Sequence, residues 1–254
     1  MELPINQFKH ALREGRTQIG LWSVMADAAA IELLGASGFD WLLIDMEHAP
    51  NELPAVQAQL QALRGSNATP IVRPPWNDIV WMKRVLDLGA QTLLIPYVQT
   101  AEEAAQAVSF MRYPPACRRG VAGGSRATQW GRIGDYYKHV EEELCLLVQV
   151  ETRQGLDNLE AIAATPGVDG VFIGPADLSA DMGYLGESRH PEVQQAIEDA
   201  VRRIRQANKA AGILARGEET ARRWLKAGCN FVAVGVDAVL LAEAADGLAA
   251  KFRV

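Results

Sequence analysis

Short apolar runs alternate with longer amphipathic stretches along the whole chain. Each run is three or four residues long and is rich in Leu, Ile and Val, without alternating polar residues. This pattern is typical of strands that are buried on both faces of a parallel sheet. The sequence predicts strands at residues 20–22, 41–44, 70–72, 92–95, 146–148, 170–173, 212–214 and 231–234.

The segments that separate these runs have the spacing of helices. They combine apolar intervals of three and four residues with strong helix formers, and several are followed by a glycine that would end a helix, as at Gly35, Gly89 and Gly228. Because strand and helix alternate throughout, we predict one (β/α)₈ (TIM) barrel rather than an open doubly wound sheet. The predicted helices cover residues 28–34, 53–63, 79–88, 101–111, 155–164, 192–208, 218–226 and 238–250.

Length and composition agree with a single domain over residues 1–254. The chain is 49% hydrophobic and carries a net charge of -6, so it has no broad positive field for nucleic acid or an anionic membrane. Its three cysteines lie far apart in no disulfide or zinc pattern, and we find no signal-like or membrane-spanning apolar stretch. We therefore expect a soluble protein of the reducing cytoplasm.

Residues 112–138 break the regular alternation. The segment is rich in Pro, Gly, Arg and aromatic residues and is longer than an ordinary connection in a barrel. Loops of this length inside a compact domain are usually functional, so we expect it to contribute to a site.

Polar side chains follow the predicted strands at the ends where a TIM barrel builds its active site. They come after the second, third, fifth and sixth strands, and we expect them to converge on one rim. The group comprises Asp45, Glu47, His48, Arg73, Gln149, Glu151 and the turn Gly174-Pro175-Ala176-Asp177.

The carboxylates of Glu151 and Asp177 suit a hard cation. No cysteine or paired histidine accompanies them, which favours Mg²⁺ or Mn²⁺ with oxygen ligands and several waters. Alternatively, each acid caps a helix or pairs with an arginine such as Arg153. The turn from Gly174 to Asp177 offers free backbone N–H groups to a substrate carboxylate, although it could be an ordinary loop with proline at the first helical position.

His48 and Arg73 are the candidates for proton transfer and for stabilising negative charge. His48 alone among the four histidines follows a predicted strand, whereas the others lie in terminal, loop or surface-like contexts. Arg73 precedes two prolines that would hold its guanidinium beside a developing enolate oxygen. The structural alternatives are a hydrogen-bonded His48 and an ion-paired Arg73, each with Asp45 or Glu47. No lysine follows a strand, which disfavours a Schiff base.

Five motifs in order resemble the HpcH/HpaI aldolase family over nearly the whole chain. Within it, the resemblance is to class II pyruvate aldolases of aromatic catabolism that act on 4-hydroxy-2-oxoheptanedioate, and to relatives acting on 2-keto-3-deoxy sugar acids. It implies reversible cleavage of 4-hydroxy-2-oxo acids into an aldehyde and pyruvate or a close analogue such as hydroxypyruvate, through an enolate, with Mg²⁺, Mn²⁺ or Co²⁺. The motifs are residues 43–50, 72–74, 91–96, 148–152 and 170–179.

The resemblance also assigns roles. Glu151 and Asp177 would ligate the metal, with the substrate carboxylate at the backbone of Ala176 and Asp177. Arg73 would stabilise the enolate, and His48, oriented by Asp87, would move the proton, with Asp45 and Gln149 in support. Family members are hexamers, trimers of dimers with an exchanged C-terminal helix, here 238–250, and residues near Val121 to Arg126 would border a neighbour's site.

The sequence does not identify the aldehyde that the enzyme would accept. Trp22, Val121 and Leu214 would line the acceptor side, but the stretch from Leu214 to Gly217 departs from the pattern of the heptanedioate enzymes. Two other functions make different demands on the sequence. A malyl- or citramalyl-CoA-type lyase would need a basic surface for the nucleotide, which is not evident. A non-catalytic keto-acid-binding barrel would require damaged metal and base positions, yet all of them are present.

Overall fold

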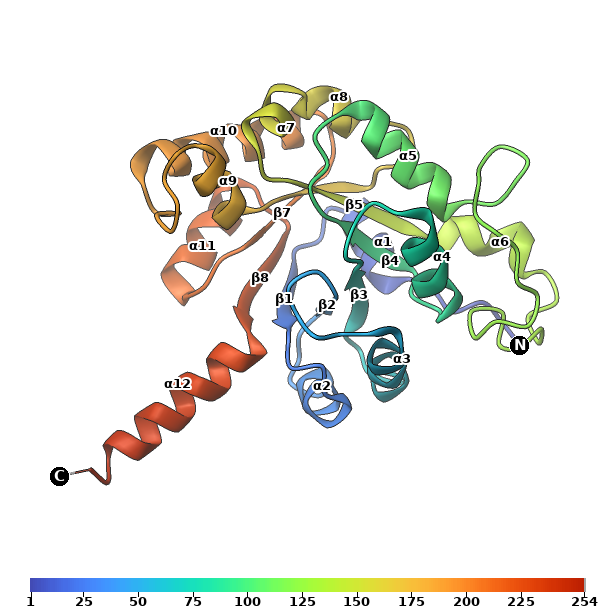
Figure 1. Cartoon of the computed structure of the whole chain (residues 1–254), viewed down its shortest axis with the longest axis horizontal. Helices are drawn as coiled ribbons and strands as arrows, with labels where there is room; N and C mark the ends of the chain where they lie inside the picture. The colour runs from blue at the N-terminus through green and yellow to red at the C-terminus, as the bar shows by residue number, and fades with distance from the viewer. Residues whose placement is uncertain (254) are drawn as a thin grey trace.

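The computed structural model describes residues 1–253 and shows eight parallel strands closed into a barrel (Figure 1). Each strand pairs with the next along the chain, and the last pairs with the first. Every predicted run lies inside one strand, so the TIM barrel is confirmed. The strands are β1 (Gln18–Ser23), β2 (Trp41–Asp45), β3 (Thr69–Arg73), β4 (Thr92–Ile95), β5 (Cys145–Val150), β6 (Gly170–Ile173), β7 (Ala210–Leu214) and β8 (Phe231–Val236).

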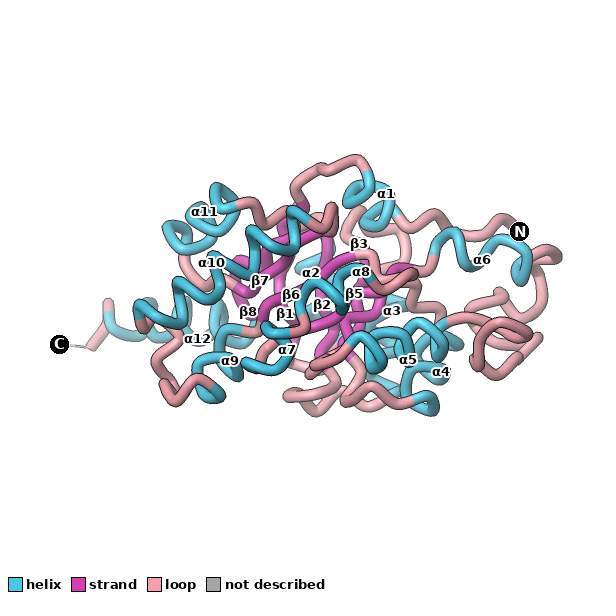
Figure 2. The backbone as a smooth tube through the Cα atoms, turned by 90° about the horizontal axis from the view of Figure 1, so that it is seen from above, coloured by secondary structure: helices cyan, strands magenta, loops and turns pink. Residues whose placement is uncertain are grey.

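Helices surround the barrel, as Figure 2 shows. The predicted helix 155–164 is two helices, since Asn158 ends one and begins the next while its side chain donates to the Gln99 carbonyl at 2.9 Å. Three short helices, α1, α6 and α9, were not predicted, and Tyr136–Lys138 of the expected loop already belong to α6. The helices are α1 (Gln7–Arg13), α2 (Ala28–Gly35), α3 (Leu53–Ala62), α4 (Ile79–Asp87), α5 (Ala101–Met111), α6 (Tyr136–Glu143), α7 (Arg153–Asp157), α8 (Leu159–Ala164), α9 (Pro175–Asp181), α10 (Pro191–Gln206), α11 (Glu218–Ala227) and α12 (Asp237–Ala250).

Alternate side chains of each strand enter two different cores. On β2, Leu42 and Ile44 pack outward under the helices, whereas Trp41 and Leu43 fill the barrel interior. Gly20 of β1 makes room for the Trp41 indole, because a Cβ there would lie 2.1 Å from the ring. The barrel is therefore a packed core, and chemistry is restricted to its rims.

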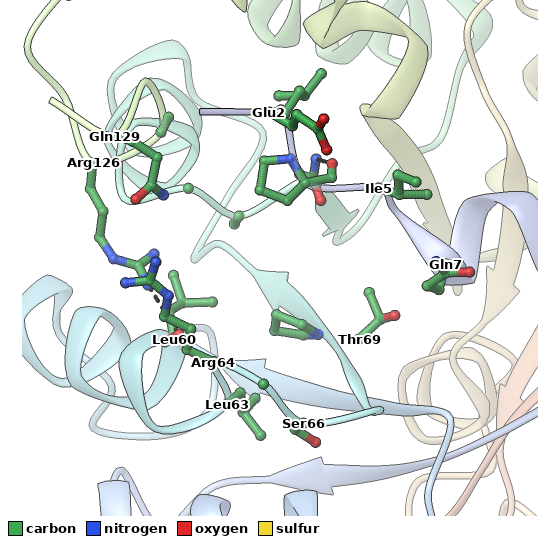
Figure 3. Close-up of a pocket in the computed structure, with 18 of the residues that line it drawn as sticks. Glu2, Ile5, Gln7, Leu60, Leu63, Arg64, Ser66, Thr69, Arg126 and Gln129 are labelled. Carbon is green, nitrogen blue, oxygen red and sulfur yellow. Dashed lines mark hydrogen bonds between the residues drawn. The ribbon is translucent and has the colours of Figure 1, made fainter. Parts of the chain in front are cut away.

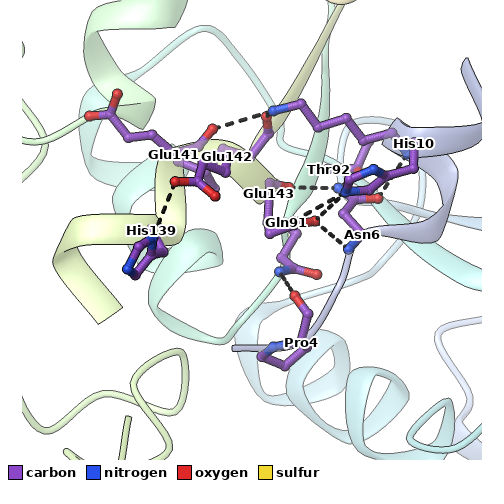
Figure 4. A network of polar contacts seen from close by, with 11 residues as sticks. Pro4, Asn6, His10, Gln91, Thr92, His139, Glu141, Glu142 and Glu143 are labelled. Atoms are coloured by element: carbon purple, nitrogen blue, oxygen red, sulfur yellow. Dashed lines mark hydrogen bonds and ion pairs between the residues drawn. The ribbon is translucent and has the colours of Figure 1, made fainter. Parts of the chain in front are cut away.

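Helix α1 closes the barrel at the amino ends of the strands. Phe8 packs edge-on against Trp41 and Phe231, with ring centroids 6.0 and 5.9 Å apart. Figure 4 shows the polar network around it, in which Asn6 donates to the Thr92 hydroxyl at 2.9 Å and Lys9 donates to the carbonyl oxygens of Glu141 and Leu144. Burial lowers the pKa of Lys9, but this lysine lies at the end opposite the predicted site.

Helix α12 extends away from the barrel (Figures 1 and 2). Asp237 fixes its start, accepting from the Ser23 hydroxyl at 2.8 Å and from the Val24 N–H at 3.0 Å. All side chains from Leu240 to Arg253 are exposed, apolar Leu241, Leu248 and Phe252 among them. Exchange of this helix between subunits stays a prediction. Among residues 1–253, no helix is long and apolar enough to cross a membrane.

Candidate active site

Arg73 stands at the centre of the rim formed by the carboxyl ends of the strands. Its Nε and Nη2 donate to the two oxygens of Asp45 at 2.9 and 2.6 Å. Its Nη1 lies 2.8 Å from Glu47 Oε2 and forms an ion pair with it, but no hydrogen bond. The guanidinium also lies 4.9 Å from the centroid of the Trp22 ring. The predicted ion pairs are present, and they hold the guanidinium in one orientation.

Asp45 is the charged partner that this arrangement keeps ionised. Burial alone would raise its pKa, but the hydrogen bonds and charge of Arg73, with a 3.1 Å hydrogen bond from Trp22 Nε1, lower the pKa of Asp45 below its usual range. Trp22, predicted to line the acceptor side, is buried here as a donor to the acid that orients Arg73. Leu214 is half-buried at the end of β7 and packs against the same inner core.

Glu151 follows β5 and is held at both oxygens. The Tyr97 backbone N–H donates to Oε1 at 2.9 Å, and the Gln149 amide donates to Oε2. The end of β6 is shaped around this carboxylate, because a Cβ on Gly174 would lie 2.2 Å from Oε2. Neither predicted alternative describes Glu151, which caps no helix and forms no ion pair within the described residues.

The acids of the site lack enough positive charge to balance them. Burial raises the pKa of Glu151 to about 7, with a further contribution from the Asp177 and Glu47 carboxylates. Burial raises the pKa of Glu47 to about 6 in spite of the nearby Arg73. Arg73 is the only arginine or lysine paired with these acids among the described residues, and the His48 ring lies 3.9 Å from Glu47. Such a cluster is stabilised when a cation joins it.

The chemistry of these residues fits a divalent metal. Glu151 and Asp177 offer carboxylate oxygens, and the buried Oε1 of Gln149 has no hydrogen-bond partner. Within residues 1–253, no set of three or more His, Cys, Asp and Glu side chains is arranged to hold a metal ion by itself. A site with so few protein ligands suits Mg²⁺ or Mn²⁺, which keep several waters and accept substrate oxygens.

The turn after β6 begins helix α9. Gly174 is the N-cap, Pro175 is the first helical residue, and Asp177 lies in the first turn. No side chain caps this turn, and Ala176 and Asp177 are exposed toward solvent. Proline stands at the first helical position, as in the ordinary loop that was the alternative to an anion site. The N–H groups of the first turn nevertheless have no side-chain partner.

His48 is at the mouth of the site. Its side chain is 63% exposed, and its Nε2 lies 3.9 Å from Glu47 Oε2. The backbone N–H of His48, not the ring, donates to Asp45 at 3.4 Å. The alternative of a partly buried, hydrogen-bonded histidine is therefore wrong, and the ring is accessible to a substrate.

Asp87 lies at the opposite end of the barrel from His48. It is the last residue of α4, which runs back from the rim, and its carboxylate pairs with Arg119 Nη2 at 3.1 Å. Arg119 is fully buried beneath the Tyr113 ring. Within one chain the structure does not bring Asp87 to His48, although they were expected to act together.

Val121 is also outside the rim of its own chain. Its neighbour Gly120 packs on Lys83 of α4, and Val121 itself is exposed. Arg126, at the end of the expected neighbour-facing stretch, turns inward and donates to the carbonyl oxygens of Leu88 and Leu60. It borders a cavity of about 520 Å³, shown in Figure 3, which none of the predicted site residues lines.

Sequence reasoning missed two features of this rim. Glu47 was predicted on the rim as a partner of His48 or Arg73, but not as a third acid beside Glu151 and Asp177, although an acid directly after a buried strand signalled this. Tyr97, whose backbone holds Glu151, has a left-handed conformation at φ +56° that no sequence pattern announced.

Known proteins match this sequence over nearly its whole length. A family model described as HpcH/HpaI aldolase/citrate lyase matches residues 18–244. The chain is 57% identical over 248 residues to a 4-hydroxy-2-oxo-heptane-1,7-dioate aldolase of Klebsiella pneumoniae subsp. pneumoniae, covering 97% of this chain and 94% of that protein. An Escherichia coli protein of the same description is 56% identical over 97% of this chain and 95% of its own length.

A solved structure is similar over the whole fold. It is a HpcH/HpaI aldolase/citrate lyase family protein from Burkholderia cenocepacia, 40% identical in sequence, with a TM-score of 0.95. The match covers 98% of this chain and 100% of that chain.

Proposed function

Because the chain belongs to the HpcH/HpaI aldolase/citrate lyase family, we propose that it cleaves 4-hydroxy-2-oxo acids, including 4-hydroxy-2-oxo-heptane-1,7-dioate, reversibly to pyruvate and an aldehyde. The chain is a class II pyruvate aldolase, a carbon–carbon lyase. The named heptanedioate is the substrate of its curated relatives and is the first compound to test. Hydroxypyruvate is a second donor worth testing beside pyruvate.

The observation that carries this proposal is the unbalanced acid cluster at the carboxyl ends of the strands. Glu47, Glu151 and Asp177 share one rim with Arg73, and burial raises the pKa values of two of them. A divalent cation would offset their repulsion, and a 2-oxo acid would complete its coordination. Enzymes of this class depend on a divalent metal ion. We propose Mg²⁺, Mn²⁺ or Co²⁺, held by Glu151 and Asp177.

When bound, the metal would polarise the 2-keto oxygen of the substrate. Arg73, fixed by Asp45, stabilises the negative charge that develops on this oxygen. The backbone of Ala176 and Asp177 receives the substrate carboxylate at the uncapped start of α9, while Gln149 orients Glu151. His48 at the mouth accepts the 4-hydroxyl proton as the C3–C4 bond breaks. Protonation of the enolate at C3 then gives pyruvate.

The positions of Asp87 and Val121 support an oligomer in which neighbouring copies complete each other's sites. Asp87 pairs with Arg119 of the long segment 112–138, and Val121 belongs to that segment, which lies at the end of the molecule opposite α12 (Figures 1 and 2). The apolar side chains of α12 are exposed and would be covered by a second copy. We propose a homohexamer, a trimer of dimers with α12 exchanged, in which Asp87 orients a neighbour's His48.

Residues 1–254 would act as one catalytic domain in the cytoplasm. A CoA-thioester lyase would need a nucleotide site, and no observation on the rim favours one. A non-catalytic barrel is not favoured either, since the acids, Arg73 and His48 are all present and follow strands of the barrel.

The test is pyruvate release from 4-hydroxy-2-oxo acids after treatment with a chelator and return of Mn²⁺. We expect activity to disappear with the chelator and return with the metal in the native chain, and to be lost in Glu151→Gln. Glu219→Gln, which changes an exposed glutamate on α11, serves as the matched control. Metal-independent release, or full activity in Glu151→Gln, would contradict the proposal.

A further inference from the structure

Two aromatic side chains form an exposed stack beside the candidate active site. Trp76 and Tyr97 lie with ring centroids 5.6 Å apart and planes inclined by 30°. Trp76 is 52% exposed and Tyr97 is 37% exposed, although large aromatic residues usually bury most of their surface. The stack therefore presents apolar ring surface to solvent.

Both rings are attached to the machinery of the site. Trp76 follows Arg73 by three residues, after the turn Pro74-Pro75 that leaves β3. Tyr97 follows β4, and its backbone N–H donates to Glu151 Oε1 at 2.9 Å. The stack thus connects the loop that follows Arg73 with the loop after β4, whose backbone donates to Glu151.

The backbone of Tyr97 is strained in a way that explains this placement. Its φ of +56° is unfavourable for a residue with a Cβ. Two hydrogen bonds hold the backbone in this conformation. The Tyr97 N–H donates to the Glu151 carboxylate, and the Val98 N–H donates to the Gln149 carbonyl at 2.9 Å. Local strain of this kind is typical of functional sites. Here it directs one N–H onto a candidate metal ligand and leaves the ring in the stack with Trp76.

We propose that the Trp76–Tyr97 stack binds the acceptor half of the substrate and selects aldehydes that carry a flat, apolar group such as an aryl ring. This inference rests on the proposed aldolase function and specifies its acceptor. Arg73, Glu151 and Asp177 account for the pyruvate half with polar contacts, whereas the stack is an apolar surface on the loops beside them. Aromatic faces bind such groups by offset stacking and by removing apolar area from water.

The experiment compares two acceptors in the direction of synthesis. Pyruvate is condensed with benzaldehyde or with propanal, which has no ring, and kcat/KM is measured for each. Trp76→Leu and Tyr97→Asn remove a ring, and asparagine tolerates the left-handed backbone at position 97. Tyr97→Phe keeps the ring, and Leu185→Ala removes an exposed apolar side chain elsewhere.

We expect each ring-removing variant to lower kcat/KM for benzaldehyde by roughly tenfold and to change the value for propanal by less than about twofold. Tyr97→Phe and Leu185→Ala should match the native chain for both aldehydes. Equal losses for the two aldehydes, or no loss for benzaldehyde, would overturn the inference. So would a change in oligomeric mass by light scattering, because it would assign the stack to a subunit interface.

A second readout separates this inference from the proposed function. Exchange of the pyruvate methyl protons in D₂O requires enolate formation but no aldehyde, so it should proceed at the native rate in Trp76→Leu. If exchange is preserved and the aldehydes are not discriminated, only the acceptor inference fails. If the native chain with Mn²⁺ shows no exchange, the aldolase proposal fails and the acceptor inference fails with it.

Discussion

Arg73 and Asp45 face each other through two parallel contacts of 2.9 and 2.6 Å at the ends of neighbouring strands. Strands β2 and β3 place these residues in register as direct partners, so the sheet itself sets the geometry. A fork of this kind fixes the plane of the guanidinium as well as its position. The remaining Nη1 lies beside Glu47, which places the Arg73 guanidinium at the centre of the acid cluster.

Arg73→Lys should slow the enzyme although the charge is retained. Lysine cannot reproduce the planar two-point contact with Asp45, so its ammonium would not be held beside the enolate oxygen. We expect kcat to fall by about 10²- to 10³-fold, the usual effect of losing a donor to a developing anion. Steady-state kinetics would check this, with the exposed Arg222→Lys as control. A loss of less than about threefold would show that charge alone is enough.

The metal-free protein should become less stable as the pH rises from about 5 to 8. The pKa values of Glu151 and Glu47 are raised to about 7 and about 6, from a usual value of 4.5. As the pH rises, these two carboxyl groups therefore lose their protons at a lower pH in the unfolded chain than in the folded chain. The stability present below pH 4.5 is lost as the pH passes through the folded-state values, and for Glu151 it amounts to roughly 3 kcal/mol at most.

Denaturant unfolding in a chelator at several pH values would measure this slope. Glu151→Gln should flatten it and be more stable than the native apoprotein near pH 8, because a neutral amide replaces the buried charge. Glu219→Gln should follow the native profile. An unchanged slope in Glu151→Gln would mean that this carboxylate does not titrate over the range.

Asp87 and His48 should complement each other across subunits. Asp87→Asn and His48→Asn should each lower carbon–carbon cleavage by about 10²- to 10⁴-fold, the usual range for loss of general base catalysis. When the two inactive variants are co-expressed, mixed oligomers would contain sites with one intact His48 and one intact neighbouring Asp87. We expect part of the native activity to return in purified mixed oligomers. If no activity returns, Asp87 serves only as a structural partner of Arg119.

Charges on α12 should weaken the assembly. Leu241 and Leu248 are exposed on a helix that contacts little of its own barrel, so Leu241→Lys with Leu248→Lys would oppose burial against a second copy. Light scattering should show a smaller particle than the native chain gives. Leu185→Lys, at an exposed leucine between α9 and α10, should leave the mass unchanged. An unaltered mass in the α12 variant would exclude this helix from the interface.

The strands and the residues that follow them were predictable because both reflect local pattern. Apolar runs of the right length mark β2 and β6, and chain order then places Asp45 and Asp177 on the same rim. Asp87 was different, since it ends α4 away from the rim and only the tertiary structure shows its ion pair with Arg119. For Lys9 the sequence predicts only that it follows no strand, and its burial becomes visible only in the closed floor of the barrel.

Tyr97 illustrates another limit of sequence reasoning. Its side chain resembles any aromatic residue after a strand, and its importance lies in a backbone N–H that every non-proline residue possesses. The left-handed conformation that turns this N–H toward Glu151 is imposed by the hydrogen bonds around it. Such a feature belongs to the three-dimensional arrangement rather than to residue type.

The packed floor formed by Phe8 and Trp41 bears on the order in which reactants would enter and leave. Because side chains fill that end of the barrel, we expect reactants to reach the site from the carboxyl ends of the strands. Arg73 and Glu151 lie at its base, 5% and 2% exposed, while His48 stands at the opening. If pyruvate binds at this base as proposed, we expect the aldehyde to depart before pyruvate in cleavage and pyruvate to bind first in synthesis, which would make the reaction kinetically ordered.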